Sequence, residues 1–131
     1  PNFSRLSDLG RLLGKLGKLD ESLVVLRFLF DNRAQASSNE QAIGIVKNLL
    51  VSLMNVKGGG DMVEVAIAAI KDYGPISVFC YQAMLGMMMQ GRHKEAWGLF
   101  SGVEQQLNPK DPLFPQFQKM KSILMQQLNL S

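Results

Sequence analysis

The chain has 131 residues, of which 47% are hydrophobic and 19% charged, a composition that excludes a disordered tail and predicts one domain with one core. Fourteen basic and eleven acidic residues give a formal charge of +3, without the concentrated basic stripe typical of nucleic-acid binders. Its single cysteine, Cys80, and single histidine, His93, exclude an intramolecular disulfide and the usual Cys- or His-based metal centres.

No segment predicts a membrane span or a secretory signal. The longest apolar stretch, residues 42–54, is interrupted by Gly44, Lys47 and Asn48, so it falls short of about 20 continuous apolar residues. The first residues lack a basic region followed by an apolar core. We therefore expect a soluble protein of the cytoplasm.

Glycine and proline divide the chain into segments of helical period, and none alternates with period two for long enough to predict a strand. Ser38 and Gln41 have the spacing of a helix-opening capping box. Asp111, followed by Pro112, has the pattern of another helix start. We expect seven helices, at about residues 4–16, 20–33, 38–56, 61–73, 76–90, 93–107 and 112–130. The fold class is all-α.

The residues around Gly17 and Gly91 form an internal repeat. Each glycine lies between two predicted helices, where it permits the positive φ that ends the first of them. In both copies a small residue follows the glycine by five positions and a large apolar residue by nine. These are Ser22 and Leu26 in the first copy, and Ala96 and Phe100 in the second. The small residue lets two antiparallel helices approach, and the large one fills the space beside it.

This pattern resembles the tetratricopeptide repeat, whose period is about 34 residues. The 74 residues between the two glycines leave room for a degenerate middle copy, with Asp61 at its turn and residues 34–39 absorbing the excess length. The resemblance implies a right-handed array of three antiparallel helix hairpins, at about 4–33, 38–73 and 76–107. A capping helix at about 112–130 would close this array, within a single domain of residues 1–131.

The helix expected at 76–90 is apolar on all sides. One stripe of it has core spacing: Cys80, Ala83, Met84 and Met87. The remaining apolar residues form a second face: Val78, Tyr81, Leu85 and Met88, with Met89 beside them. The helix expected at 38–56 is apolar around most of its circumference and adds Val51 and Met54. We predict that these seven residues line a partner-binding groove that accepts an amphipathic helix. The alternative is that the last helix covers the second face and makes it core.

Basic residues gather on one face of the first helix, at Arg11 and Lys15, with Lys18 beyond it. A solvated face with partial pairing to Asp8 is the expectation, and anion binding is the alternative.

The sequence does not predict an enzyme. It has no phosphate-binding loop and no nucleophile–base pair at a useful spacing, so we expect no cofactor and no metal. RNA binding through pentatricopeptide-like repeats would need polar, base-reading side chains, where the helix at 76–90 offers Val78, Tyr81 and Met88.

An apolar groove on a short hairpin array resembles the small tetratricopeptide-like chaperones of bacterial type III secretion. Those proteins hold a needle or translocator subunit in the cytoplasm by burying its amphipathic helix. The resemblance implies a protein partner, a small helical secreted subunit, and a second small co-chaperone. A scaffold or adaptor in another multiprotein complex is the alternative within the binding class.

Overall fold

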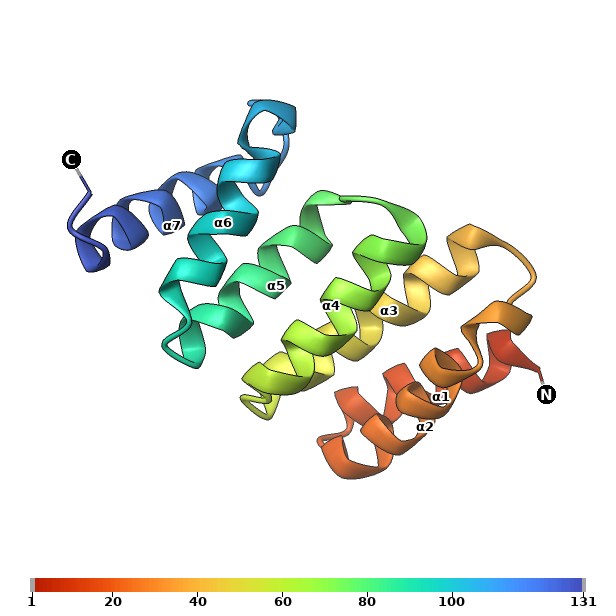
Figure 1. The fold of residues 1–131 in the computed structure, drawn as a ribbon. Helices are drawn as coiled ribbons and strands as arrows, with labels where there is room; N and C mark the ends of the chain where they lie inside the picture. Colours follow the sequence, from red (N-terminus) through yellow and green to blue (C-terminus); the bar gives the residue numbers. More distant parts are fainter. Residues whose placement is uncertain (1, 131) are drawn as a thin grey trace. The chain divides into compact units, whose positions relative to one another are not determined.

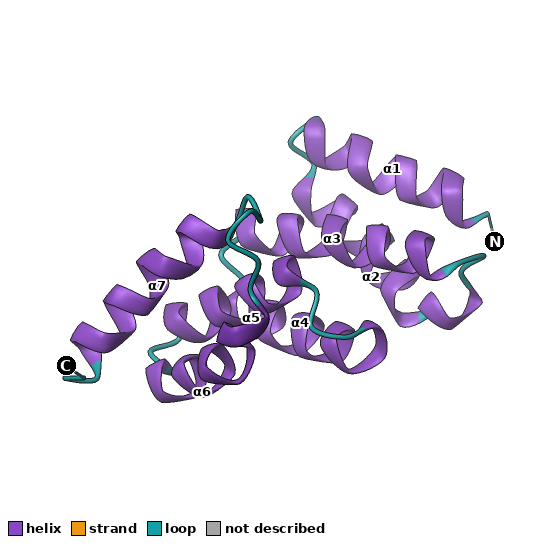
Figure 2. Cartoon of the chain, turned by 90° about the horizontal axis from the view of Figure 1, so that it is seen from above, coloured by secondary structure: helices purple, strands orange, loops and turns teal. Residues whose placement is uncertain are grey.

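The computed structural model describes residues 2–130, which form helices joined by short loops, with no strand among them (Figures 1 and 2). The chain divides into two compact units that meet between Gly58 and Gly59. Each unit is described by itself below, and the expectation of a single domain over residues 1–131 stays a prediction. The all-α fold class is confirmed for the described residues.

The N-terminal unit contains α1 (Phe3–Lys15), α2 (Leu19–Asp31), the 3₁₀ helix η1 (Arg33–Gln35) and α3 (Asn39–Asn55). Helix α2 packs against both α1 and α3, and its Leu26 and Leu29 are fully buried. Gly10 brings α1 close to α2, because a Cβ there would lie 2.8 Å from Leu26 Cδ2. The Ser22 hydroxyl donates to the Gly10 carbonyl at 2.5 Å. The small residue of the repeat therefore stands where the two helices approach.

The capping box predicted for α3 is present with one change of partner. The Ser38 Oγ accepts from the Gln41 N–H at 3.1 Å. The Gln41 Oε1 reaches one residue further back and accepts from the Ser37 N–H at 2.8 Å. Its Nε2 donates to the Ser4 hydroxyl at 3.1 Å, which ties the start of α3 to the start of α1.

The C-terminal unit contains α4 (Gly59–Tyr73), α5 (Ser77–Met89), α6 (His93–Val103), the 3₁₀ helix η2 (Glu104–Gln106) and α7 (Phe114–Gln127). Helix α5 packs against α4 and α6, and α7 packs against α6. The core includes Ala96, Phe100 and Phe117, which are all fully buried. Ala96 thus occupies the buried position that the repeat predicts for a small residue.

Three helix-ending turns share one geometry. The residues with positive φ are Gly17, Lys57 and Gly91, and each donates its N–H to the carbonyl three positions earlier. The next residue in each turn donates to the carbonyl five positions earlier, which is the Schellman pattern. Lys57 and Gly91 are 34 residues apart, and Gly17 and Lys57 are 40 apart. The prediction that Asp61 holds the middle turn is wrong, because the turn lies at Lys57 and Asp61 is already inside α4.

Two predicted helix ends also shift. Helix α6 ends at Val103 and continues as η2, so it is shorter than the predicted 93–107. Helix α7 begins at Phe114 with Pro115 in its first turn, instead of Pro112. Asp111 acts one step earlier, since its Oδ1 accepts from the Leu113 N–H at 2.8 Å and closes the turn before the helix.

Two of the three expected hairpins lie within one unit and are present, α1 with α2 and α5 with α6. The expected pairing of α3 with α4 joins the two units and stays a prediction. Among the residues that the structure describes, no helix is both long enough and apolar enough to cross a membrane.

Candidate functional site

The apolar residues predicted to line a groove on α5 share one face of that helix. Their spacing of three and four residues from Val78 to Met88 places them in a strip along the helix. Val78, Tyr81, Leu85 and Met88 are each half-buried, whereas Met89 is 44% exposed. We call these five residues the α5 strip. The C-terminal unit therefore keeps an apolar strip partly open to solvent.

Helix α7 contacts one member of this strip. The ring of Tyr81 lies edge-on to Phe117, with 5.9 Å between the ring centroids and an interplanar angle of 81°. Tyr81, Leu85 and Met88 all pack against the core of the C-terminal unit. The strip thus combines features of both readings of the sequence: part of each side chain is held by the core, and part stays accessible.

The opposite side of α5 is core, as predicted. Cys80, Ala83, Met84 and Met87 are buried. Burial raises the pKa of the Cys80 thiol, so the thiol stays protonated and is a poor nucleophile.

The sequence analysis missed a third buried face of α5, formed by Phe79, Gln82 and Gly86. At Gly86 a Cβ would lie 2.7 Å from the Gly59 carbonyl oxygen, so α4 crosses α5 here in close contact. A glycine inside an otherwise apolar helix is a sequence signal for such an approach. Three faces of α5 are therefore committed: one to α4, one to the C-terminal core, and one to the α5 strip.

Val51 and Met54 lie on α3, in the N-terminal unit. They are 50% and 37% exposed, respectively. Each precedes a member of the α5 strip by 34 residues, Val51 before Leu85 and Met54 before Met88, which is also the separation between the turns at Lys57 and Gly91. They therefore occupy the same repeat positions as two strip residues. That all seven residues form one groove stays a prediction.

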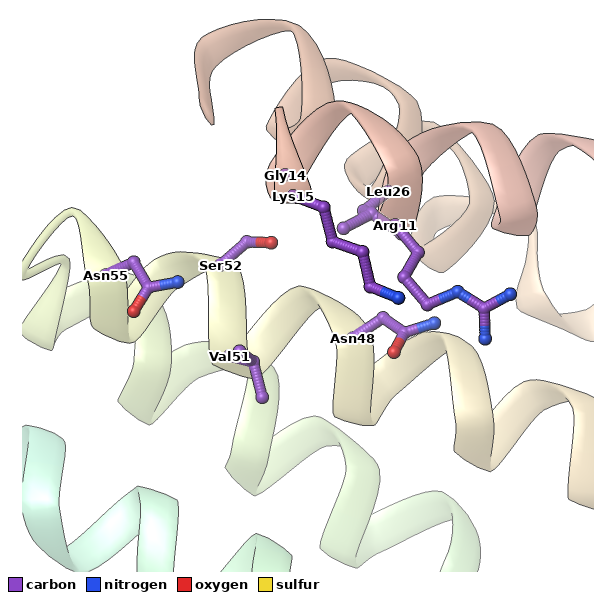
Figure 3. Close-up of a pocket in the computed structure, with 8 residues that line it drawn as sticks. All are labelled: Arg11, Gly14, Lys15, Leu26, Asn48, Val51, Ser52 and Asn55. Carbon is purple, nitrogen blue, oxygen red and sulfur yellow. The ribbon is translucent and has the colours of Figure 1, made fainter. Parts of the chain in front are cut away.

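The N-terminal unit has a pocket of about 320 Å³ between α1 and α3. Figure 3 shows the side chains of Arg11 and Lys15 extending from α1 toward α3, where Asn48, Ser52 and Asn55 follow one another along the helix. Gly14, Leu26 and Val51 complete the lining. The predicted ion pair is present, with Arg11 Nη2 at 3.0 Å from Asp8 Oδ1. The other half of the expectation, a face solvated throughout, is incomplete, because Arg11 and Lys15 also line this pocket.

Sequence reasoning missed the three polar residues of α3 in this pocket. They are 33 or more positions away from Lys15 in the chain, so no local pattern connects the two sets. The described residues contain no group of three or more His, Cys, Asp or Glu side chains that could hold a metal ion.

Comparison with protein-family models, with curated proteins and with solved structures finds no match to this chain.

Proposed function

We propose that this chain is a non-enzymatic protein-binding module built from tetratricopeptide-like hairpins, and that the α5 strip holds an amphipathic helix of a protein partner. The 34-residue spacing of the turns at Lys57 and Gly91 supports the repeat assignment. The small residues Ser22 and Ala96, both fully buried at hairpin contacts, support it as well.

The observation that carries the binding proposal is the composition of the α5 strip. Its five positions contain no charged residue, although each is at least partly exposed. A helix face of this kind can bury the apolar side of a second helix. Methionine suits such a contact, because its flexible side chain adapts to the partner's shape.

The finer form of the proposal is a cytoplasmic chaperone for a secreted subunit, such as a type III secretion needle subunit, acting with a second small helical protein. In this role the strip would cover a helix that otherwise polymerises, and would release it for export. The support is the resemblance in architecture and in the apolar strip. A scaffold or adaptor in another complex would use the same strip for a partner that stays bound.

The test is purification of the tagged chain from its native host, followed by gel filtration and mass spectrometry of the co-eluting proteins. We expect one or two small helical proteins at near-equal stoichiometry. Met89→Glu places a charge at the most exposed position of the strip and should remove the partner. Leu85→Glu should do the same at its centre.

The matched control is Ser101→Glu, which adds the same charge at an exposed position of α6. It should leave the complex intact, and circular dichroism should show equal helicity for all variants. Full-stoichiometry co-purification with both Met89→Glu and Leu85→Glu would refute the proposal. Nuclease-sensitive RNA in the peak, without protein, would replace it with RNA binding.

A further inference from the structure

The pocket between α1 and α3 differs from the α5 strip in both charge and shape. Its volume of about 320 Å³ lies at the lower end of the roughly 300–1,000 Å³ range of ligand pockets. It therefore has room for one side chain and a short piece of backbone, but not for a whole helix.

The lining of this pocket carries positive charge only. Arg11 and Lys15 contribute two cations, and no carboxylate belongs to the lining. Asp8 pairs with Arg11, but both side chains are more than half exposed, and such surface pairs are weak. With Asp8 counted, the local charge is +1, which matches a carboxylate better than a phosphate monoester of charge near −2.

Polar groups on α3 face the same space without partners. The side chains of Asn48, Ser52 and Asn55 line the pocket, and none hydrogen-bonds to another residue that the structure describes. Two amide NH₂ groups and one hydroxyl are thus available as donors. The guanidinium of Arg11 adds planar paired donors that fit the two oxygens of a carboxylate.

Two apolar residues form the remaining wall. Leu26 is fully buried and Val51 is half exposed, and both line the pocket. They provide contact for the methylene groups that precede a side-chain carboxylate. We propose that this pocket binds a carboxylate, carried by an acidic side chain of a peptide. This inference does not depend on the α5 strip.

The experiment titrates the full ¹⁵N-labelled chain with acetyl-Ala-Glu-Ala-amide and follows its NMR spectrum. Acetyl-Ala-Gln-Ala-amide is the uncharged control peptide, and inorganic phosphate is the competing anion. We expect the Glu peptide to shift the side-chain amide signals of Asn48 and Asn55. Arg11→Gln should weaken binding about tenfold, because it removes the charge-assisted paired hydrogen bonds.

The matched control is Arg5→Gln, the same substitution at an exposed position of α1 outside the pocket. It should change the affinity less than about twofold, since an exposed charge farther from the ligand is screened. Asn48→Asp provides a second variant of nearly unchanged shape, and it should abolish binding by repulsion.

Three results would overturn the proposal. The first is equal shifts with the Glu and Gln peptides. The second is an unchanged affinity in both Arg11→Gln and Asn48→Asp. The third is a response to inorganic phosphate without a response to the Glu peptide.

Discussion

Helices α1 and α5 end in the same turn but present opposite chemistry on the equivalent face. The turns at Gly17 and Gly91 are 74 residues apart, and this separation relates each member of the α5 strip to one residue of α1. The pairs are Val78 with Ser4, Tyr81 with Ser7, Leu85 with Arg11, Met88 with Gly14, and Met89 with Lys15. Every apolar residue of the strip thus has a small, polar or charged counterpart on α1.

This difference teaches that the hairpin framework and the binding face are specified by separate residues. The framework depends on the turn residue and on buried small residues such as Ser22 and Ala96. The face depends on positions that remain partly exposed, which can change from cationic to apolar without disturbing the helix contacts. Helix α3 is intermediate, because it presents both Val51 and Asn55.

The largest expected effect tests the shared framework. Ala96→Trp should reduce the free energy of unfolding by at least about 3 kcal/mol, because a large ring cannot fit at a fully buried helix contact. Ser22→Trp should do the same in the N-terminal unit. Urea denaturation measures both, and Ser101→Trp at an exposed site is the control. A tolerated tryptophan at either position would end the equivalence of the two hairpins.

The second effect tests the faces by transferring one to the other. Leu85→Arg with Met89→Lys gives α5 the residues found on α1, and should weaken the proposed partner's affinity about 100-fold by removing the apolar contact and adding charge. Stability should change little, since long basic side chains can keep their charge in water. Isothermal titration with the co-purified partner measures the affinity. Unchanged affinity would show that α5 is framework only.

The third effect concerns the middle turn. Lys57 adopts φ of 57°, where Gly17 and Gly91 have glycine. Lys57→Gly should raise the free energy of unfolding by about 0.5–1 kcal/mol, because glycine adopts this conformation without a Cβ clash. Gly91→Ala should lower stability by a similar amount. Thermal unfolding measures both, and a destabilising Lys57→Gly would mean that the lysine side chain makes a compensating contact.

The smallest effect is pH-dependent and confined to the C-terminal unit. The Leu113 N–H, with a further hydrogen bond from Ser77, holds the pKa of Asp111 below its usual range. A depressed folded-state pKa stabilises the fold above the unfolded value near 4, and this contribution is lost as pH falls through the folded value. Asp111→Asn keeps an acceptor for Leu113 but cannot titrate. Its stability between about pH 5 and pH 2 should therefore fall slightly less than that of the parent chain.

Local signals explain what the sequence could predict. Gly17, Gly91 and the Ser38 cap are recognisable because glycine and serine have a specific role at helix ends. The turn at Lys57 was misplaced for the same reason, since lysine gives no signal for positive φ and the following glycines drew the break toward Asp61.

Contacts between distant residues explain what the sequence could not predict. The meeting of Arg11 with Asn48 depends on how α1, α2 and α3 pack, and the contact of Tyr81 with Phe117 depends on α7. Neither pair has a spacing that a helical period would reveal. The polar pocket therefore emerged only with the fold, whereas the apolar strip was already visible as a surplus of hydrophobic residues on one helix.

The burial of Cys80 turns the only thiol of the chain into a built-in reporter of opening. In the folded unit this thiol is protonated and 1% exposed, so a maleimide can react only when α5 separates from its neighbours. The rate of labelling in the absence of denaturant then measures how often the C-terminal unit opens. The same measurement with a partner bound reports how strongly that partner holds the helix in place.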